Sequence, residues 1–242
     1  TSIQTIRSAL AALGCSTLLI APDYPGGREE EPGITRVRGR QVPFDLEDRL
    51  MSRRDLERAC ASREGQFDLV HIQTPFRAHA AGVRLARRMG VPVIESYHTY
   101  FEHYFHHYMP YLPRAWLAFA ARALSRHQCN AVDAVVAPSR QMADALAAYG
   151  IRTAIRVIPT GLDLERFKGG DGARFRARFG IAPDRPLMLT VSRVAFEKNI
   201  GFLIDVLDRV RQTVPNVLLV IAGEGPALGS LERAVVQRGL VA

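Results

Sequence analysis

The chain has 242 residues, of which 48% are hydrophobic and 23% are charged, a balance typical of a globular protein with a sizeable core. It contains no run of about 18 apolar residues, so no segment is expected to span a membrane as a helix. The formal net charge of +8 comes mostly from arginine, whose planar side chain favours phosphates and carboxylates. Because no nucleic-acid-binding motif accompanies this charge, nucleic acid is not expected as a partner.

The three cysteines, Cys15, Cys60 and Cys129, are odd in number, far apart and without a C-x-x-C spacing. This pattern favours neither a disulfide framework nor a zinc ribbon. A reducing, cytoplasmic location is therefore predicted.

Helices and strands alternate along the first two thirds of the chain. Amphipathic or glycine-terminated segments predict helices at residues 2–13, 52–61, 78–89, about 113–130 and 140–149. Apolar or alternating segments predict strands at residues 16–23, 35–44, 67–76, 91–99, 134–139 and 152–161. Repeated strand, helix, strand units build parallel sheets through right-handed crossovers, with helices on both faces.

The pattern loosens over residues 158–180, and the glycines within 168–172 favour a linker there. A second alternating unit follows, with strands at 186–194 and 217–226 and helices at 199–213 and 228–238. The fold class is therefore α/β, with two parallel-sheet domains at residues 1–164 and 165–242. We expect the second domain to be incomplete, because the chain stops where another strand is due. The first opens on a helix without a preceding strand.

Polar residues end or follow six of the predicted strands, in the segments QTPF, SYHT, PSR, PTGLD, SRVAFEKN and GEGP. Ligands of open parallel sheets gather outside the carboxyl ends of the strands. Each segment alone is typical of a turn or a helix cap, but six together predict a lined crevice.

The segment SRVAFEKN carries the most specific signal. Arg193 follows a strand directly and Lys198 lies near the start of the next helix, so two cations meet the positive end of a helix dipole. Such a site suits a diphosphate and would stabilise negative charge on a leaving nucleotide diphosphate. The alternative is a surface turn in which Arg193 pairs with a carboxylate.

The stretch at residues 96–113 holds four of the seven histidines. His103 and His107 would share one face of a helix, which raises the alternative of a metal site. No HExxH motif is present, and the interleaved tyrosines favour an amphipathic wall that takes an acceptor or touches a membrane surface, so no metal is predicted. His98 stands apart, at a strand end. Ser139, without a G-x-S-x-G elbow, is expected to cap a helix.

The segments HIQTPF, YHTYFEHY, VDAVVAPSR, VIPTGLDLERF, LTVSRVAFEKNI and VLLVIAGEGP, in this order and spacing, resemble glycosyltransferase family 4 (group 1) enzymes of the GT-B fold. The resemblance covers nearly the whole chain. It implies two Rossmann-like domains facing each other across a cleft. It also implies transfer of a hexose from a nucleotide diphosphate sugar, a UDP- or GDP-sugar, with retention of configuration and without a metal. The implied acceptor is a lipid or a glycan hydroxyl.

The resemblance also implies roles for individual residues. His98, Arg193 and Lys198 would be catalytic, with His98 beside the donor sugar and the attacking hydroxyl. The implied donor-binding residues are Arg193, Lys198, Gly223, Glu224, Gly225, Pro226, Ser139, Thr160 and Gly161, of which the last two belong to an interdomain crossover. The pattern YHT-x-F-E-x-Y resembles the branch that glucosylates diacylglycerol, and implies acceptor binding by Tyr97, Thr99, Glu102 and Tyr104. The resemblance to this branch implies that the protein is cytoplasmic and contacts an anionic membrane at the inner face of that membrane.

Two family elements are missing from the sequence: an opening strand with its glycine-rich loop, and a closing pair of glutamates. We therefore expect the chain to be a fragment without activity of its own. Two alternatives stay open. A nucleotide-sugar epimerase of the same architecture would need carboxylates in the cleft, for which Glu95 and Glu102 are the candidates. A sugar-nucleotide or lipid-headgroup binding module would need no catalytic group.

Overall fold

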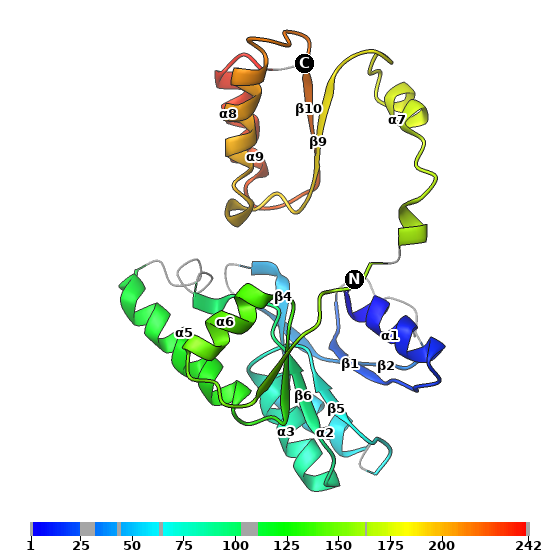
Figure 1. Ribbon diagram of the computed structural model, residues 1–242, viewed down its shortest axis with the longest axis vertical. Coiled ribbons are helices and arrows are strands. Elements are labelled where there is room, and N and C mark those ends of the chain that lie inside the picture. The colour runs from blue at the N-terminus through cyan, green and yellow to red at the C-terminus, as the bar shows by residue number, and fades with distance from the viewer. Residues whose placement is uncertain are drawn as a thin grey trace. The chain divides into compact units, whose positions relative to one another are not determined.

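The computed structural model describes residues 2–24, 32–42, 45–62, 65–102, 111–162 and 164–240. The chain forms two units, Thr1–Asp163 and Leu164–Ala242, each with its own parallel strands and helices (Figure 1). The predicted α/β class with parallel sheets is confirmed. Among the described residues, no helix is both long and apolar enough to cross a membrane.

The main sheet of the first unit has four parallel strands in the order β5-β6-β7-β8. Their bounds are Val70–Ile72, Val93–Ser96, Ala134–Ala137 and Ala154–Val157. The intervening helices are α3 (Arg77–Met89), α5 (Arg114–Cys129) and α6 (Arg140–Ala148), and each connects two neighbouring strands. Buried Ile72, Val135 and Leu146 belong to the core between these strands and helices, so the hydrophobic strands of the sequence are covered as predicted.

The beginning of the first unit departs from the sequence prediction. After α1 (Ser2–Ala12), β1 (Leu19–Pro22) pairs in parallel with β2 (Ile34–Val37). β3 (Gly39–Val42) then pairs with β4 (Asp45–Met51) in an antiparallel hairpin. The single strand predicted at 35–44 is therefore wrong, because the chain changes partners between β2 and β3. The strand β4 was not predicted, since DLEDRL carries little strand propensity without its partner.

The backbone packs closely against its neighbours at Gly39, the first residue of β3. A Cβ atom there would lie 3.1 Å from Cβ of Arg49 and 3.2 Å from Cβ of Pro22. Val37 and Met51 then enter a second core with α2 (Arg53–Ala61) and α3, which includes buried Leu56. The hairpin is thus anchored to the same helix α3 that covers the main sheet.

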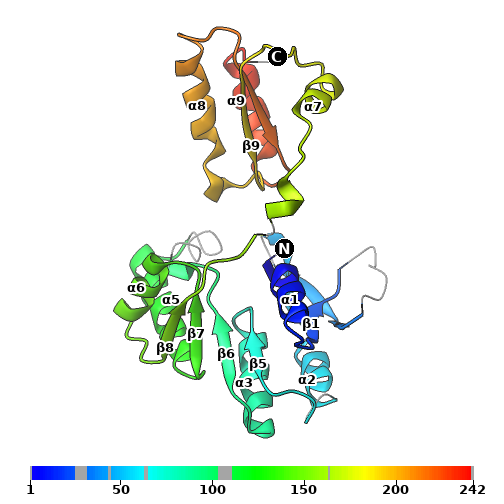
Figure 2. The ribbon, with the colours of Figure 1, turned by 45° about the vertical axis from the view of Figure 1, so that its right-hand side comes forward.

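The second unit opens with a 3-10 turn, Leu164–Phe167, and with α7 (Gly172–Arg178), whose first turn is capped by Asp171. β9 (Leu187–Val191) and β10 (Leu218–Ala222) form a parallel pair, and Figure 2 shows α8 (Ile200–Val210) and α9 (Leu228–Gln237) beside it. Val194, Ile200 and Ala227 are the buried centre of this unit. The predicted strand, helix, strand, helix order is confirmed here.

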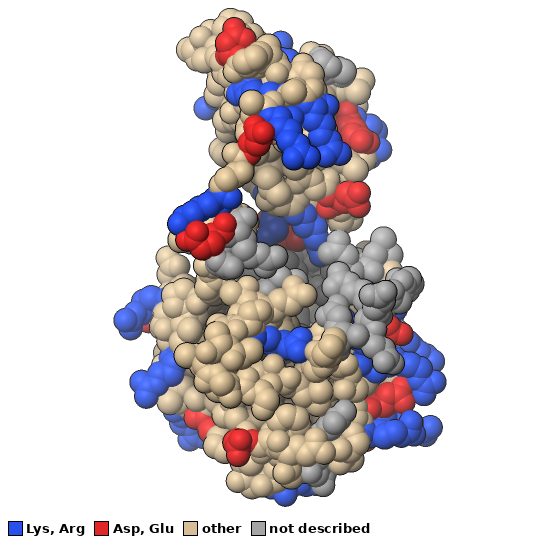
Figure 3. Space-filling view, turned by 90° about the vertical axis from the view of Figure 1, so that its right-hand side faces the viewer, with Lys and Arg blue, Asp and Glu red and all other residues tan. Residues whose placement is uncertain are grey.

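Charge is spread over the surface. On the face shown in Figure 3, Lys and Arg side chains occur on both units with Asp and Glu side chains among them. The excess of basic residues in the sequence thus does not gather into one stripe on this face.

Candidate functional site

The carboxyl ends of β5 and β6 carry a chain of four hydrogen-bonded polar side chains. Nε2 of His71 lies 2.8 Å from Oγ of Ser96 and 2.9 Å from the amide nitrogen of Gln73. The amide oxygen of Gln73 lies 2.8 Å from Nε2 of His98. Alternate residues of a strand share a face, and His71 stands opposite Ile94 in the register, so all four side chains lie on one face of the sheet. His98 is therefore oriented by neighbours from two strands.

Both imidazoles of this chain are held towards their neutral form. Burial lowers the pKa of His71 to about 4, and the nearby His98 adds to this shift. Burial also lowers the pKa of His98, whose ring is the more exposed of the two. At neutral pH, the predicted catalytic histidine is thus presented as an uncharged imidazole.

Tyr97 points to the opposite face and belongs to the core. Its hydroxyl lies 2.6 Å from Oγ of Ser125 on α5, and its ring packs edge-on against Phe101 at 5.6 Å between centroids. Burial raises the pKa of its phenol to about 12. The hydroxyl of Tyr97 is thus bonded inside the first unit, and its acceptor-binding role stays a prediction. Thr99 is half-buried in the segment that follows.

Glu102 is also engaged inside the first unit. Its carboxylate accepts hydrogen bonds from the hydroxyl of Tyr149 at 2.6 Å and from Nε of Arg122 at 3.1 Å, and it also contacts Nη2 of Arg122. These bonds raise the pKa of Arg122. Glu102 thus ties the segment after β6 to α5 and to the end of α6, which favours a structural role over acceptor binding. Tyr104, His103 and His107 lie outside the described residues.

The other candidate carboxylate, Glu95, is buried on the far face of β6. Its Oε2 lies 3.2 Å from Nδ1 of His79 on α3, and both side chains are almost fully buried. Neither Glu95 nor Glu102 therefore presents an open carboxylate for an epimerase reaction. The epimerase alternative loses its two candidate groups.

The polar residues after β7 and β8 differ in their surroundings. Oγ of Ser139 accepts a hydrogen bond from the backbone nitrogen of Met142 at 3.2 Å, so this serine is the N-cap of α6 that its sequence predicted. Thr160 and Gly161 lie in the exposed segment that follows β8. Their donor-binding role stays a prediction.

In the second unit, Arg193 and Lys198 lie on either side of the short turn that leads into α8. Lys198 is exposed at the end of the 3-10 turn Phe196–Lys198, and Asn199 enters the helix with a left-handed φ of 48°. Nη2 of Arg193 lies 3.6 Å from Oε1 of Glu197. Arg193 therefore also pairs with a carboxylate, as the alternative of a surface turn predicted. The unpaired N–H groups of the first helical turn and an exposed ammonium group thus occur together, which is an arrangement suited to an anion.

The GEGP segment is fastened to this same turn by its backbone. The backbone nitrogen of Val194 donates to the carbonyl of Glu224 at 2.7 Å, and the nitrogen of Ala227 donates to the carbonyl of Val194 at 3.0 Å. Gly223 and Gly225 have φ values of 153° and 154°. Added Cβ atoms would lie 1.9 Å from the carbonyl oxygen of Ser192 and 2.3 Å from that of Val194. Only glycine permits this approach of the two loops.

These bonds bring the predicted donor-binding residues of the second unit together. The loop with Arg193 and the loop with Gly223–Pro226 follow the neighbouring strands β9 and β10 and form one surface, on which Glu224 and Pro226 are exposed. The sequence placed the two loops at strand ends but did not show that they are bonded to each other.

His71, Gln73 and Ser96 were not among the predicted site residues. A signal for them was present: H-x-Q and S-x-H repeat with the period of two that places side chains on one face of a strand. The signal was missed because it requires the pairing of β5 with β6.

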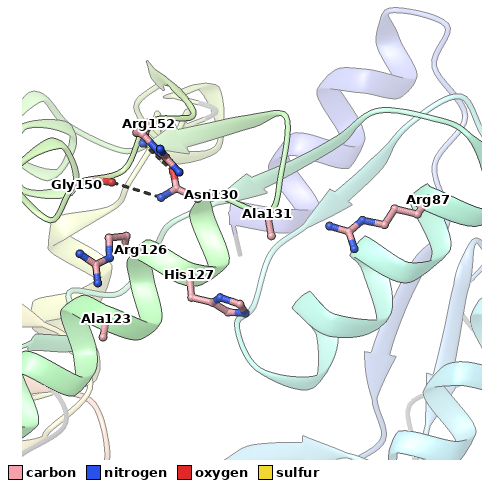
Figure 4. A pocket seen from close by; sticks show the side chains of 8 residues that line it. All are labelled: Arg87, Ala123, Arg126, His127, Asn130, Ala131, Gly150 and Arg152. Carbon is pink, nitrogen blue, oxygen red and sulfur yellow. Dashed lines mark hydrogen bonds between the residues drawn. The ribbon is translucent and has the colours of Figure 1, made fainter.

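A surface pocket of about 630 Å³ occurs elsewhere in the first unit (Figure 4). It is lined by Arg87, Ala123, Arg126, His127, Asn130, Ala131, Gly150 and Arg152. These residues precede the strands β6, β7 and β8, so the pocket lies at the strand ends opposite to the polar network. Its arginines complement the negative helix ends of α3 and α5, and Asn130 bridges the backbone of Arg152 and Gly150. We therefore assign it a structural role.

No group of three or more His, Cys, Asp or Glu side chains in the described ranges is arranged to hold a metal ion. His103 and His107, the pair that raised the alternative of a metal site, lie outside the described ranges.

The comparisons with known proteins define the class. The structure resembles that of HepE from Anabaena, determined in complex with UDP-glucose, with a TM-score of 0.63 and 16% identity over 86% of this chain and 53% of that one. This similarity shows the fold, which is that of the GT-B glycosyltransferases.

The chain belongs to Glycosyltransferase Family 4, whose pattern it matches over residues 1–166, and it matches Glycosyl transferases group 1 over residues 171–241. It is 32% identical to the alpha-monoglucosyldiacylglycerol synthase of Streptococcus pneumoniae over 96% of this chain and 54% of that protein. It is 25% identical to the protein of the same name from Acholeplasma laidlawii over 97% of this chain and 62% of that protein. The chain thus spans little more than half the length of these relatives. The predicted family resemblance is confirmed.

Proposed function

We propose that the complete protein is a retaining glycosyltransferase that moves a sugar from a nucleotide diphosphate sugar to an acceptor hydroxyl. The observation that carries the proposal is a surface of the group 1 domain in which Lys198, Arg193 and the start of α8 lie beside the glycine loop, a combination suited to an anion. UDP- or GDP-sugars are the proposed donors. The UDP-glucose bound to the structurally similar HepE supports the first of these.

The proposed chemistry needs charge stabilisation more than it needs a nucleophile. As the bond between the sugar and the diphosphate breaks, negative charge grows on the leaving oxygen, and Lys198 and Arg193 stabilise it without a metal. No activated nucleophile supports a covalent intermediate at the described strand ends. We therefore propose that the acceptor oxygen bonds to the anomeric carbon on the face that the diphosphate leaves, while the acceptor hydroxyl gives its proton to the leaving phosphate oxygen. His98 hydrogen-bonds to a reacting hydroxyl group.

One assay of the complete protein tests this reaction. A labelled UDP-, GDP- or ADP-sugar is incubated with lipid or glycan acceptors, and the anomeric configuration of the product is determined by NMR spectroscopy. We expect retention, and unchanged rates after treatment with a chelator. An inverted product contradicts the retaining mechanism, and an epimerised donor formed without any acceptor supports the epimerase. Donor binding without any conversion supports the binding module.

A lipid acceptor is the proposed substrate class, and an exposed aromatic surface supports it. Trp116 and Phe119 lie three residues apart on α5 and are 71% and 73% exposed, and Tyr111 before the helix is 95% exposed. Arg114 adds a positive charge at the start of the same helix. Aromatic side chains with basic neighbours are typical of helices that lie in a membrane interface. Two relatives named as alpha-monoglucosyldiacylglycerol synthases support the same proposal.

We expect the double variant Trp116→Ser and Phe119→Ser to weaken binding to vesicles of anionic phospholipid at least about tenfold, because each ring buries apolar area in the interface. Cosedimentation with vesicles measures this effect on the complete protein. Phe167→Ser is the matched control, since Phe167 is 71% exposed but lies in the second unit. Equal binding of the double variant and the wild type would contradict a membrane role for α5.

A lipid acceptor also bears on location. We propose that the complete protein acts in the cytoplasm, at the inner face of the membrane.

A further inference from the structure

The hydrogen-bonded chain at the ends of β5 and β6 runs from the interior to the surface. Ser96 is buried, His71 and Gln73 are half-buried, and His98 is exposed. Gln73 is the central member, because its amide group contacts both imidazoles, at 2.9 Å and 2.8 Å. A change in Gln73 therefore affects both histidines at once.

A carboxamide has a donor at one end and an acceptor at the other. The two Nε2 atoms that it joins must consequently have opposite protonation, with one carrying a hydrogen and one carrying a lone pair. The amide oxygen of Gln73 faces His98, so Nε2 of His98 carries the hydrogen. The amide nitrogen faces His71, so Nε2 of His71 carries the lone pair, which the hydroxyl of Ser96 also approaches at 2.8 Å.

We propose that Gln73 is a positioning residue that holds His98 as its Nε2–H tautomer and leaves Nδ1 of His98 as a hydrogen-bond acceptor for a substrate hydroxyl group. This inference rests on the proposed function of His98. Among the described residues, His98 makes no other hydrogen bond, so Nδ1 is available to a ligand. A lone pair on Nδ1 accepts the hydrogen of a hydroxyl group and repels an ionised phosphate oxygen. His98 thereby selects a sugar or acceptor hydroxyl at this point.

A purely structural role for Gln73 predicts something different. If the amide only ties β5 to β6, its loss lowers stability while the tautomers of the two histidines stay unspecified. The two roles are therefore separated by the protonation of the ring nitrogens, which long-range proton–nitrogen NMR spectroscopy reports without any need for turnover.

The experiment uses the complete protein labelled with nitrogen-15 histidine, with the signals of His71 and His98 assigned through the His71→Asn and His98→Asn variants. For the wild type we expect the Nε2–H tautomer at His98 and the Nδ1–H tautomer at His71.

In Gln73→Glu both carboxylate oxygens of residue 73 accept hydrogen bonds, so Nε2 of His71 gains a hydrogen while Nε2 of His98 keeps its hydrogen. In Gln73→Met, which removes both bonds at similar volume, His98 becomes a mixture of tautomers. Gln141→Met, an exposed glutamine on α6, leaves both spectra unchanged.

The Nδ1–H tautomer at His98 in the wild type overturns the inference, and so does an unchanged spectrum in both Gln73 variants. In the sugar-transfer assay we expect Gln73→Met to lower kcat about tenfold, less than the roughly hundredfold or more that a positioned proton-transfer group contributes, because His98 itself remains. An unaltered kcat in that variant also overturns the proposed selection of a hydroxyl group. If the complete protein transfers no sugar at all, the proposed function fails, whereas the tautomers at Gln73 are still decided by the spectra.

Discussion

Replacement of Lys198 by alanine in the complete protein is expected to lower kcat for sugar transfer by two to three orders of magnitude, roughly the loss seen when one group that stabilises developing negative charge is removed. The physical reason is that Lys198 carries one of the two positive charges proposed to face the leaving diphosphate, and the other, on Arg193, is partly engaged by Glu197. Lys198 forms no ion pair with another described residue, so its truncation leaves the fold intact. The rate with saturating donor measures the effect.

Lys168 offers a matched control, because it is the chain's other lysine. It is exposed and pairs with Glu165 at 2.5 Å in the turn Leu164–Phe167. Lys168→Ala is expected to keep nearly the full rate, since a surface ion pair of this kind contributes little. Near-normal transfer by Lys198→Ala, with circular dichroism unchanged, would rule out its proposed role at the diphosphate.

The second large effect is expected at Gly225. An alanine there places its Cβ 2.3 Å from the carbonyl oxygen of Val194, at a φ of 154° that side chains rarely adopt. The backbone strain and the overpacking together cost roughly 3 kcal/mol or more. Because the GEGP segment is bonded to the loop of Arg193, we expect loss of nucleotide-sugar binding as well as a lower unfolding temperature of the complete protein.

Gly229→Ala is the control for this substitution. Gly229 lies in the first turn of α9, where an added Cβ would meet only Nη1 of Arg233, at 3.7 Å. Alanine there should keep or slightly raise stability, because it favours the helix. A Gly225→Ala protein that melts and binds donor like the wild type would disprove the requirement for glycine.

Much of the fold follows from local pattern. Apolar runs such as STLLIA and AVVA, separated by amphipathic segments, predicted parallel strands and their helices, because the periods of two and 3.6 residues are set by the backbone itself. The hairpin of β3 and β4 did not follow, since the polar segment DLEDRL becomes a strand only through pairing with β3. Gly39, which opens β3 and packs closely against Arg49, gives no periodic signal.

The candidate site was predictable in position but only partly in composition. Strand ends were correctly placed, and Ser139 caps α6 as its sequence indicated. The hydroxyl of buried Tyr97, by contrast, bonds to Ser125, and half-buried Glu102 bonds to Tyr149. Neighbouring residues of one motif thus separate onto two faces of the sheet.

The sequence by itself determined the family, the α/β class and the loops that carry charge, because these depend on residue types and on spacing along the chain. Only the tertiary structure decided which side chains remain open to a ligand. Ser125 lies 28 residues from Tyr97, and Tyr149 lies 47 residues from Glu102. Gln73 reaches His98 only because β5 and β6 pair, across 25 residues. Whether a polar side chain is available to a ligand depends on hydrogen-bond partners that are distant in sequence. No local sequence pattern can predict these partners.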